Sequence, residues 1–230
     1  YIGFGLQNAD ADYQAVDIVL HKNGSTCTIL ERGEMLGQLD LQVPGKHNIQ
    51  NALAAIAFGR TIGMEFPMIT AGLQAFTGVG RRFEKLGEGL GITVVDDYAH
   101  HPTEIRATLQ AALQMGYQRV ICVFQPHRYS RTKALAEEFG SAFTGADMVV
   151  INEIYSASEK PLPGVSAQLL VDAIQKNGQK EVSYAPTEEA VLQFLHKNMQ
   201  AGDLVLIMGA GNIRHAGELL AQELEAWSCQ

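Results

Sequence analysis

The chain has 230 residues, with 17 Lys and Arg against 25 Asp and Glu, so its formal net charge is −8. Hydrophobic residues make up 47% and charged residues 18%, a composition that suits a globular core and argues against intrinsic disorder. No apolar run approaches the roughly 18 residues that a membrane span requires. The acidic balance argues against nucleic acid as a partner, because nucleic-acid-binding proteins present a basic face.

The cysteines and the start of the chain indicate its context. Cys27, Cys122 and Cys229 are far apart and include no Cys-x-x-Cys pair. This spacing excludes a disulfide framework and a cysteine-based zinc site, and it fits a reducing, cytoplasmic compartment. The chain begins at Tyr1 without a basic and apolar leader, so we expect a processed protein or part of a longer one.

Residues 1–43 have the pattern of short strands and turns. The expected strands are Asp17–Leu20, Thr26–Leu30 and Leu36–Val43. Asn23-Gly24 predicts a hairpin turn between the first two. Further along, the apolar residues recur at helical spacing, which predicts a helix over residues 47–62 and another over Pro67–Phe76. Residues 78–80 follow as a glycine-rich linker.

From residue 83 the chain alternates between apolar strands and amphipathic helices. The expected strands are Ile92–Val95, Val120–Phe124, Met148–Ile151, Val182–Tyr184 and Leu204–Met208. One helix is expected to carry Leu135, Phe139 and Phe143, and the last one to include Ile213. The alternation predicts an α/β fold, a Rossmann-like doubly wound and mainly parallel sheet. Residues 79–230 suit one complete domain of this kind, whereas residues 1–78 are too few and too loosely patterned to stand alone.

Ligands of open α/β sheets bind beyond the carboxyl ends of the strands. Four of the expected strands are followed there by polar clusters, at residues 96–101, 125–131, 152–159 and 209–212. Arg128 and Arg131 lie three apart at the start of a helix, where the helix dipole disfavours cations. An anionic ligand held by the paired guanidinium groups explains their place better than solvated surface arginines do.

The cluster after the first of these strands is open to three interpretations. Asp96, Asp97, His100 and His101 have the chemistry of a zinc or manganese site. An Asp or His here could equally cap the helix that begins at Pro102. In the third interpretation, Asp97 binds a ribose hydroxyl.

Three further features are weaker signals. His47 and Asn51 share a helix face that could bind adenine. Helix capping by His47 or Asn48 is the better explanation of these residues. Residues 209–211 (Gly-Ala-Gly) resemble half of a dinucleotide fingerprint and serve equally well as a tight turn. The Arg81-Arg82 pair at the domain junction suits either solvent or a phosphate.

Four longer strings, in this order, resemble the Mur ligases. They are residues 45–55 (Gly-Lys-His-Asn-Ile-Gln-Asn-Ala-Leu-Ala-Ala), 81–84 (Arg-Arg-Phe-Glu), 96–105 (Asp-Asp-Tyr-Ala-His-His-Pro-Thr-Glu-Ile) and 124–132 (Phe-Gln-Pro-His-Arg-Tyr-Ser-Arg-Thr). The resemblance runs from residue 45 to about residue 211. The doubled histidine and the string after residue 124 favour the branch that adds L-alanine over those that add D-glutamate or a diamino acid.

The resemblance implies a domain assignment. Residues 1–78 would be the end of the central ATP-binding domain, and residues 79–230 the complete Rossmann-like C-terminal domain. The family's phosphate-binding loop, Gly-x-x-Gly-Lys-Ser/Thr, is expected upstream, because no Gly-Lys-Ser/Thr occurs in this chain. The magnesium ligands are also expected upstream, so no metal ligand is assigned here.

The resemblance also implies roles for single residues. Asn51, with Asn48 nearby, would contact the adenine of ATP. Arg82 would reach the ATP phosphates and take part in catalysis, and Asp97 would hold the ribose. The residues expected to line the amino-acid and muramoyl end are Tyr98, His100, His101, Arg128 and Arg131, with His100 also expected to be catalytic.

The implied reaction is ATP- and Mg²⁺-dependent joining of L-alanine to the lactyl carboxylate of UDP-N-acetylmuramate through an acyl phosphate, a step of peptidoglycan precursor synthesis. The expected partners are these small molecules and the missing N-terminal domains, with neither nucleic acid nor membrane. The 230-residue chain alone is expected to be inactive. The alternatives are a murein tripeptide recycling ligase of the same family, which usually has Phe where Tyr98 stands, a metal-dependent hydrolase using Asp96, Asp97, His100 and His101, and a non-catalytic nucleotide-binding module.

Overall fold

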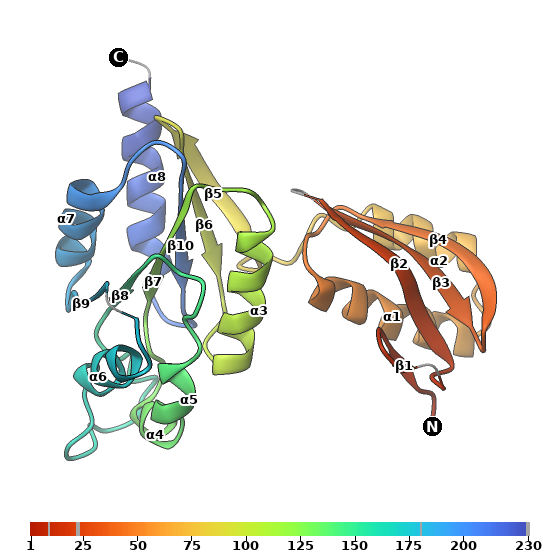
Figure 1. The fold of residues 1–230 in the computed structure, drawn as a ribbon, viewed down its shortest axis with the longest axis horizontal. Helices are drawn as coiled ribbons and strands as arrows, with labels where there is room; N and C mark the ends of the chain where they lie inside the picture. Colours follow the sequence, from red (N-terminus) through yellow and green to blue (C-terminus); the bar gives the residue numbers. More distant parts are fainter. Residues whose placement is uncertain (9, 22–23, 180, 229–230) are drawn as a thin grey trace. The chain divides into compact units, whose positions relative to one another are not determined.

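The computed structural model describes residues 1–8, 10–21, 24–179 and 181–228. The chain forms two compact units, Tyr1–Gly78 and Val79–Gln230 (Figure 1). Each unit has its own sheet and its own buried core. Among the helices described, none is both long enough and apolar enough to cross a membrane.

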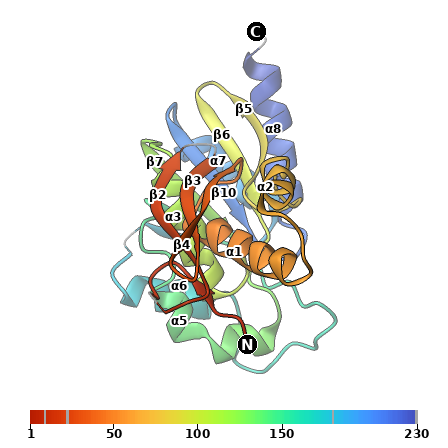
Figure 2. The same ribbon diagram turned by 90° about the vertical axis from the view of Figure 1, so that its right-hand side faces the viewer.

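The smaller unit is a sheet with two helices packed on one face (Figure 2). Across the described part of this sheet the strand order is β1 (Phe4–Gly5), β2 (Tyr13–His21), β3 (Gly24–Glu31) and β4 (Glu34–Leu41). The helices are α1 (Lys46–Thr61) and α2 (Phe66–Gln74). These elements confirm the expected strands and helices, and add β1. The expected turn residue Asn23 lies outside the described residues, although β2 and β3 do pair as antiparallel neighbours.

Alternate strand residues and one stripe of α1 make the core of this unit. The side chains that are fully buried include Ile29, Leu39, Ile49, Leu53 and Ile56. Burying one such side chain contributes about 1.5–3 kcal/mol to the stability of the fold. This gain explains why the helical spacing of apolar residues beyond Pro44 predicted a helix correctly.

The larger unit is built on a second sheet, and it confirms the α/β class. The strands described in it are β5 (Glu84–Gly89), β6 (Ile92–Asp97), β7 (Arg119–Phe124), β8 (Met148–Ile151), β9 (Val182–Tyr184) and β10 (Asp203–Met208). Their order across the sheet is β5-β6-β10-β7-β8-β9. All neighbours are parallel except β5, which runs antiparallel to β6.

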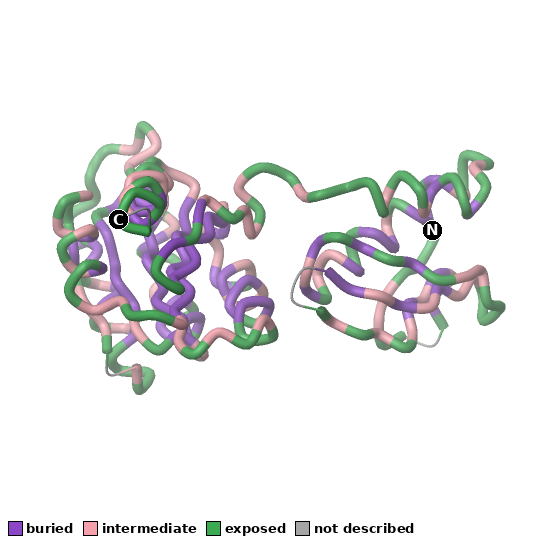
Figure 3. Tube along the Cα trace, turned by 90° about the horizontal axis from the view of Figure 1, so that it is seen from above, coloured by how far each residue is buried: buried purple, intermediate pink, exposed green. Residues whose placement is uncertain are grey.

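Helices cover both faces of this sheet. On one face lie α3 (Pro102–Leu113), α4 (Tyr129–Ala134), α5 (Ala136–Gly140) and α6 (Gln168–Lys176). The other face is covered by α7 (Glu188–Asn198) and α8 (Arg214–Ser228). Successive residues point to opposite faces, so that Val95 packs in one core and Val94 in the other. The central strands β6, β7, β8 and β10 are therefore buried on both sides, as the purple segments of the larger unit in Figure 3 show.

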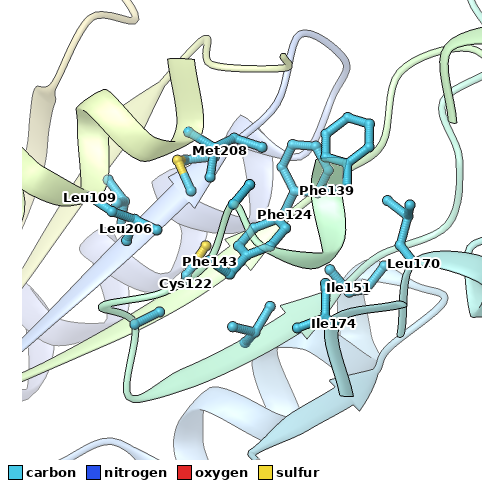
Figure 4. Packing of buried hydrophobic residues seen from close by; sticks show 14 of the residues in the cluster. Leu109, Cys122, Phe124, Phe139, Phe143, Ile151, Leu170, Ile174, Leu206 and Met208 are labelled. Carbon is cyan, nitrogen blue, oxygen red and sulfur yellow. The ribbon is translucent and has the colours of Figure 1, made fainter. Parts of the chain in front are cut away.

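Aromatic packing dominates the core on the α3 side (Figure 4). The ring of Phe124 lies 5.5 Å from that of Phe139 and 5.3 Å from that of Phe143. Cys122 lies in the same cluster with no exposed surface, as its apolar neighbours predicted. This cluster fixes the carboxyl ends of β7 and β8, on which the polar loops are mounted.

Three elements of the larger unit differ from the sequence prediction, and in the last helix the difference is small: Ile213, expected inside it, precedes its start at Arg214. β5 was not expected, because its sequence holds a single large apolar residue. It forms where α8 packs closely on the strand: a Cβ on Gly89 would lie 2.3 Å from the Leu224 carbonyl oxygen. The expected single helix over Leu135, Phe139 and Phe143 is wrong. The chain breaks at Leu135 (φ −112°, ψ 16°) into α4 and α5, and Phe143 follows their end. The apolar spacing continues across the break, so periodicity alone does not indicate it.

Candidate active site

The parallel strands of the larger unit end in register at one edge of the sheet. Asp97 pairs with Met208, Met208 with Phe124, Phe124 with Ile151, and Ile151 with Tyr184. These residues end β6, β10, β7, β8 and β9. The polar segments that follow the strands are therefore brought to one edge, as the sequence predicted.

The connections at this edge leave toward opposite faces. After β7 and β8 the chain enters α4, α5 and α6 on one face, and after β9 and β10 it enters α7 and α8 on the other. The neighbouring strands β10 and β7 thus send their loops apart. In open α/β sheets this is the position at which ligands bind.

Four aromatic rings form a row along the edge. The ring centroids of Tyr98 and His100 are 5.4 Å apart in a T-shaped arrangement, and those of His100 and His127 are 5.8 Å apart. The rings of His127 and Tyr155 are stacked at 5.7 Å. Tyr98 and His100 were expected at the site, whereas His127 and Tyr155 were not singled out. Both lie inside polar clusters that follow strands, at residues 125–131 and 152–159, but no spacing indicated that their rings would stack.

Arg128 and Arg131 lie beside the middle of this row. Arg131 Nη1 is 3.4 Å from His127 Nδ1. Burial lowers the pKa of His127, and the neighbouring Arg131, His100 and Arg128 lower it further. A neutral His127 can accept a hydrogen bond from Arg131. Two guanidinium groups beside a neutral acceptor suit a carboxylate or a phosphate.

Arg128 is the N-cap residue of α4, so the first of these arginines stands at the start of a helix, as the sequence predicted. Arg128 has φ 72°, in the left-handed region, and its N–H donates to the carbonyl of Tyr155 at 2.8 Å. The following helix α4 has only six residues, so it carries little macrodipole. The repulsion between these arginines and the helix dipole, which the sequence predicted, is therefore weak. The case for an anion rests instead on Arg128, Arg131 and the histidines lying together.

Asp97 ends β6 and is 95% buried, with a relative exposure of 5%. Its Oδ2 accepts the N–H of Phe83 at 2.9 Å, and its Oδ1 accepts that of Ala99 at 2.7 Å. Burial raises the pKa of this carboxyl group, although the two N–H donors and Arg82 oppose the rise. Each carboxylate oxygen accepts two hydrogen bonds, so each keeps one position for a hydroxyl donor.

The two arginines of the pair at residues 81 and 82 have different surroundings. Arg81 is held within the unit: its Nε donates to Asp96 Oδ2 at 3.1 Å and its Nη2 donates to the Gly209 carbonyl at 2.7 Å. Arg82 is half-exposed, and its Nη1 lies 4.0 Å from Glu104 Oε1. Both guanidinium groups lie over the ring of Tyr98, at 4.9 and 5.7 Å. Arg82 is therefore the member of the pair that is available to a ligand.

The two consecutive histidines are also distinct. His101 caps α3, because its ring Nδ1 accepts the Thr103 N–H at 3.3 Å and Glu104 completes a capping box. This confirms capping as the role of the His101 side chain. The Nδ1 of His100 lies 2.9 Å from the carbonyl oxygen of Tyr98, to which it donates, and 3.5 Å from Glu104 Oε2.

The proposed metal cluster does not assemble. Asp96 pairs with Arg81 and Arg214, Asp97 accepts two backbone N–H groups, and His101 is occupied by α3. Throughout the described residues, no group of three or more His, Cys, Asp and Glu side chains could hold a metal ion. These residues therefore do not fit a metal centre, which disfavours the hydrolase alternative.

Three side-chain amides, of which Gln125 and Asn152 are buried, connect the loops in a network that the sequence did not predict. Gln125 Nε2 donates to Asn152 Oδ1 at 3.0 Å and to Asn212 Oδ1 at 2.9 Å, while its Oε1 accepts the Ile213 N–H at 3.3 Å. Asn152 Nδ2 donates onward to the Ala185 carbonyl at 2.7 Å. This network fixes the segments after β7, β8, β9 and β10 relative to one another. Only the packing of the strands brings these amides together, so no sequence spacing could indicate it.

The adenine-binding candidates lie in the smaller unit. Asn51 is exposed on α1. Asn48 Nδ2 donates to the Pro44 carbonyl at 2.7 Å. The N-cap residue of α1 is Gly45, and no described side chain caps this helix, so the capping interpretation of His47 and Asn48 is wrong. Adenine binding by Asn48 and Asn51 stays a prediction.

Comparison with known proteins decides the family. A model described as "Mur ligase, glutamate ligase domain" matches residues 81–211, which is more than half of the chain. The chain belongs to the Mur ligase family. A model of the "Mur ligase middle domain" matches residues 1–59 as well. The family resemblance seen in the sequence is therefore confirmed.

Curated relatives share one name. The chain is 49% identical over 222 residues to the UDP-N-acetylmuramate–L-alanine ligase of Pelotomaculum thermopropionicum, which covers 96% of this chain and 48% of the relative. It is 47% identical over 225 residues to the ligase of the same name from Syntrophotalea carbinolica, covering 98% and 49%. The chain thus spans about half the length of the curated relatives it matches.

Solved structures agree with the fold. UDP-N-acetylmuramate-alanine ligase MurC from Thermotoga maritima matches with a TM-score of 0.82 at 27% identity, over 98% of this chain and 48% of that one. The murein peptide ligase Mpl of Psychrobacter arcticus matches with a TM-score of 0.69 at 24% identity, over 96% and 46%. At that lower identity the second likeness shows the fold alone.

Proposed function

We propose that this Mur ligase chain belongs to an ATP-dependent enzyme that joins L-alanine to the lactyl carboxylate of UDP-N-acetylmuramate. The observation that carries the proposal is the gathering of Arg128 and Arg131 around His127 at the carboxyl edge of the sheet. The names of the relatives at 49% and 47% identity support the same substrates. A cytoplasmic location fits these substrates.

The paired arginines would hold the α-carboxylate of L-alanine. Charge-assisted bonds from two guanidinium groups fix both the charge and the direction of a carboxylate. His100 would face the amine, because its Nδ1 is engaged with Tyr98 and its Nε2 is the ring nitrogen left for a substrate. Tyr98 stands between this histidine and the arginines at residues 81 and 82. His101 would act only through the start of α3.

The nucleotide end would use a different set of residues. Arg82 is the half-exposed cation suited to the ATP phosphates, and Asp97 offers free acceptor positions to the ribose hydroxyls. Asn51 and Asn48 of the smaller unit would contact the adenine. No residue of this chain is proposed as a ligand of Mg²⁺, whose ligands the family resemblance assigns to the part of the enzyme that this chain does not include.

The chemistry proceeds in two steps. The lactyl carboxylate attacks the γ-phosphorus of ATP, ADP leaves, and an acyl phosphate forms. The alanine amine then attacks the acyl carbon, inorganic phosphate leaves, the C–N bond forms, and the nitrogen loses a proton. Arg82 would stabilise the charge on the transferred phosphoryl group, and His100 would form a hydrogen bond with the amino-acid substrate.

The experiment is product analysis with the full-length enzyme. Protein supplied with ATP, Mg²⁺, UDP-N-acetylmuramate and L-alanine should release one ADP for each amide formed, detected by mass spectrometry. A parallel reaction replaces L-alanine by the tripeptide L-Ala-γ-D-Glu-meso-diaminopimelate. Ligation of the tripeptide in preference to L-alanine would refute the proposal in favour of a recycling ligase.

A further inference from the structure

A cavity lies beside Tyr155, at the end of the row of rings. It has a volume of about 400 Å³ and lies among the segments that follow β7, β8, β9 and β10. Its polar walls include Asn152, Glu153, Ser156, Thr187 and Glu188. None of the roles proposed above uses this space.

Tyr155 forms the wall between this cavity and the arginine cluster. One side of its ring stacks on His127, which contacts Arg131, and the residue also lines the cavity. Its backbone is tied to the loop after β7 by two bonds: Tyr155 N–H donates to the Pro126 carbonyl and Arg128 N–H donates to the Tyr155 carbonyl, both at 2.8 Å. The position of the ring is therefore fixed by the same loop that carries the arginines.

The turn after β10 closes the other side of Tyr155. A Cβ added to Gly211 would lie 2.6 Å from Tyr155 Cγ and 2.2 Å from Gln125 Oε1. Only glycine fits such an approach, so the turn presses directly on the base of the ring. The ring is held from three directions although the residue is 40% exposed. Surface tyrosines need no such support.

The cavity has an acidic and polar lining. Glu153 accepts the Tyr184 hydroxyl at 2.5 Å and the Ile154 N–H at 2.8 Å, and Glu188 lies 2.7 Å from His215 Nδ1. No lysine or arginine is among the described residues that line it. A neutral amide or an amine would be accepted here, whereas an additional carboxylate would be repelled.

We propose that Tyr155 is a specificity-determining residue, which closes the cavity to the amino-acid site and so limits the enzyme to small amino acids. This inference rests on the proposed function, because it takes the α-carboxylate to be held by Arg128 and Arg131. Removal of the ring would join the cavity to the site. The enlarged site would take side chains of the length of glutamine and would disfavour the isosteric glutamate.

The test measures kcat/KM of the full-length enzyme for L-alanine, L-glutamine and L-glutamate. In Tyr155→Ala, the ratio of L-glutamine to L-alanine should rise by at least about 10-fold, the scale on which pockets discriminate side-chain size. L-Glutamate should gain much less than L-glutamine. Tyr155→Phe is the matched control, because it keeps the ring and should keep the wild-type ratio. Tyr155→Leu repeats the comparison with a smaller loss of volume if the alanine variant does not fold.

Each outcome has a separate meaning. A wild-type enzyme that does not use L-alanine contradicts the proposed function. A wild-type enzyme that uses L-alanine, with ratios unchanged in Tyr155→Ala or Tyr155→Leu, overturns the role of Tyr155. Loss of turnover on all three amino acids in a folded variant also overturns it, since Tyr155 would then support His127 rather than select by size. An equal gain for L-glutamate and L-glutamine contradicts the acidic lining of the cavity.

Discussion

The salt-bridge network around Glu84 makes a sharp prediction for the stability of the larger unit. Both oxygens of Glu84 accept from Arg214, at 2.7 and 3.0 Å, and Oε2 also accepts the Arg81 N–H at 2.6 Å. Arg214 and Arg81 bind the buried Asp96 as well. Glu84→Gln keeps the shape of the side chain but removes the charge that holds the two arginines.

The magnitude follows from the pKa of this carboxyl group. The bonds from Arg214 and then from Arg81 lower it from 4.5 to about 2. At 1.36 kcal/mol per pH unit this is an upper limit of roughly 3.4 kcal/mol. The side chain is 35% exposed, so solvent screening reduces the expected cost to about 1–2 kcal/mol at pH 7. Because the folded pKa is the lower one, this stability is present above pH 4.5 and is lost as the pH falls toward 2.

The assay uses the single tryptophan of the sequence, Trp227, which lies on α8 in the larger unit. Urea unfolding followed by its fluorescence should place Glu84→Gln about 1–2 kcal/mol below wild type at pH 7, with a smaller difference at pH 3.5. Glu137→Gln, on the exposed surface of α5, is the matched control. A difference that is absent at pH 7, or that grows as the pH falls, would refute the reasoning.

Three further predictions concern other parts of the molecule. Gly211→Ala should lower the free energy of unfolding of the larger unit by about 1–3 kcal/mol, because its Cβ meets Gln125 and Tyr155. Gly80→Ala is the control and should have little effect, because its Cβ would meet only Glu84 Oε2 at 3.8 Å. Equal losses of unfolding free energy in the two variants, followed by Trp227 fluorescence, would contradict the close approach at Gly211. Burial raises the pKa of Cys27 to about 11 and raises that of Cys122 as well. In a Cys229→Ser variant, a thiol reagent at pH 8 should therefore label no cysteine until denaturant is added. Rapid labelling of the native protein would contradict this prediction and show that these sites open. The 230-residue chain alone should show no alanine-dependent ATP hydrolysis, measured as phosphate release, and turnover above the no-alanine control would contradict the expected need for upstream domains.

The fold of the larger unit was predictable where burial alone decides structure. β6, β7 and β10 are buried on both faces, so their sequences are unbroken apolar runs that periodicity detects. β5 could not be found this way, because Gly87 and Gly89 are there for the close approach of α8 and not for strand propensity. The break at Leu135 was not found either, because Leu135, Phe139 and Phe143 are spaced as on one continuous helix.

The candidate site was likewise predictable where chain order decides it and unpredictable where packing decides it. The edge of the sheet and the pair Arg128 and Arg131 follow from chain order, since each polar cluster comes directly after a strand. The stack of His127 on Tyr155 joins residues that lie in different loops. The choice between capping and metal binding for His101 depended on the direction of its ring. These contacts form only when the strands assemble into the sheet, so the sequence alone did not predict them.

The most direct test of the central claim is the effect of Arg131→Ala on the KM of the full-length enzyme for L-alanine. Loss of a charge-assisted bond to the α-carboxylate, about 1.5–3 kcal/mol, should raise this KM by roughly 10- to 100-fold while the KM for ATP stays unchanged. Lys133→Ala, on the exposed side of the same helix, should leave both constants at their wild-type values. An Arg131→Ala enzyme with a normal KM for L-alanine, or with the loss confined to ATP, would contradict the assignment of this edge of the sheet to the amino-acid substrate.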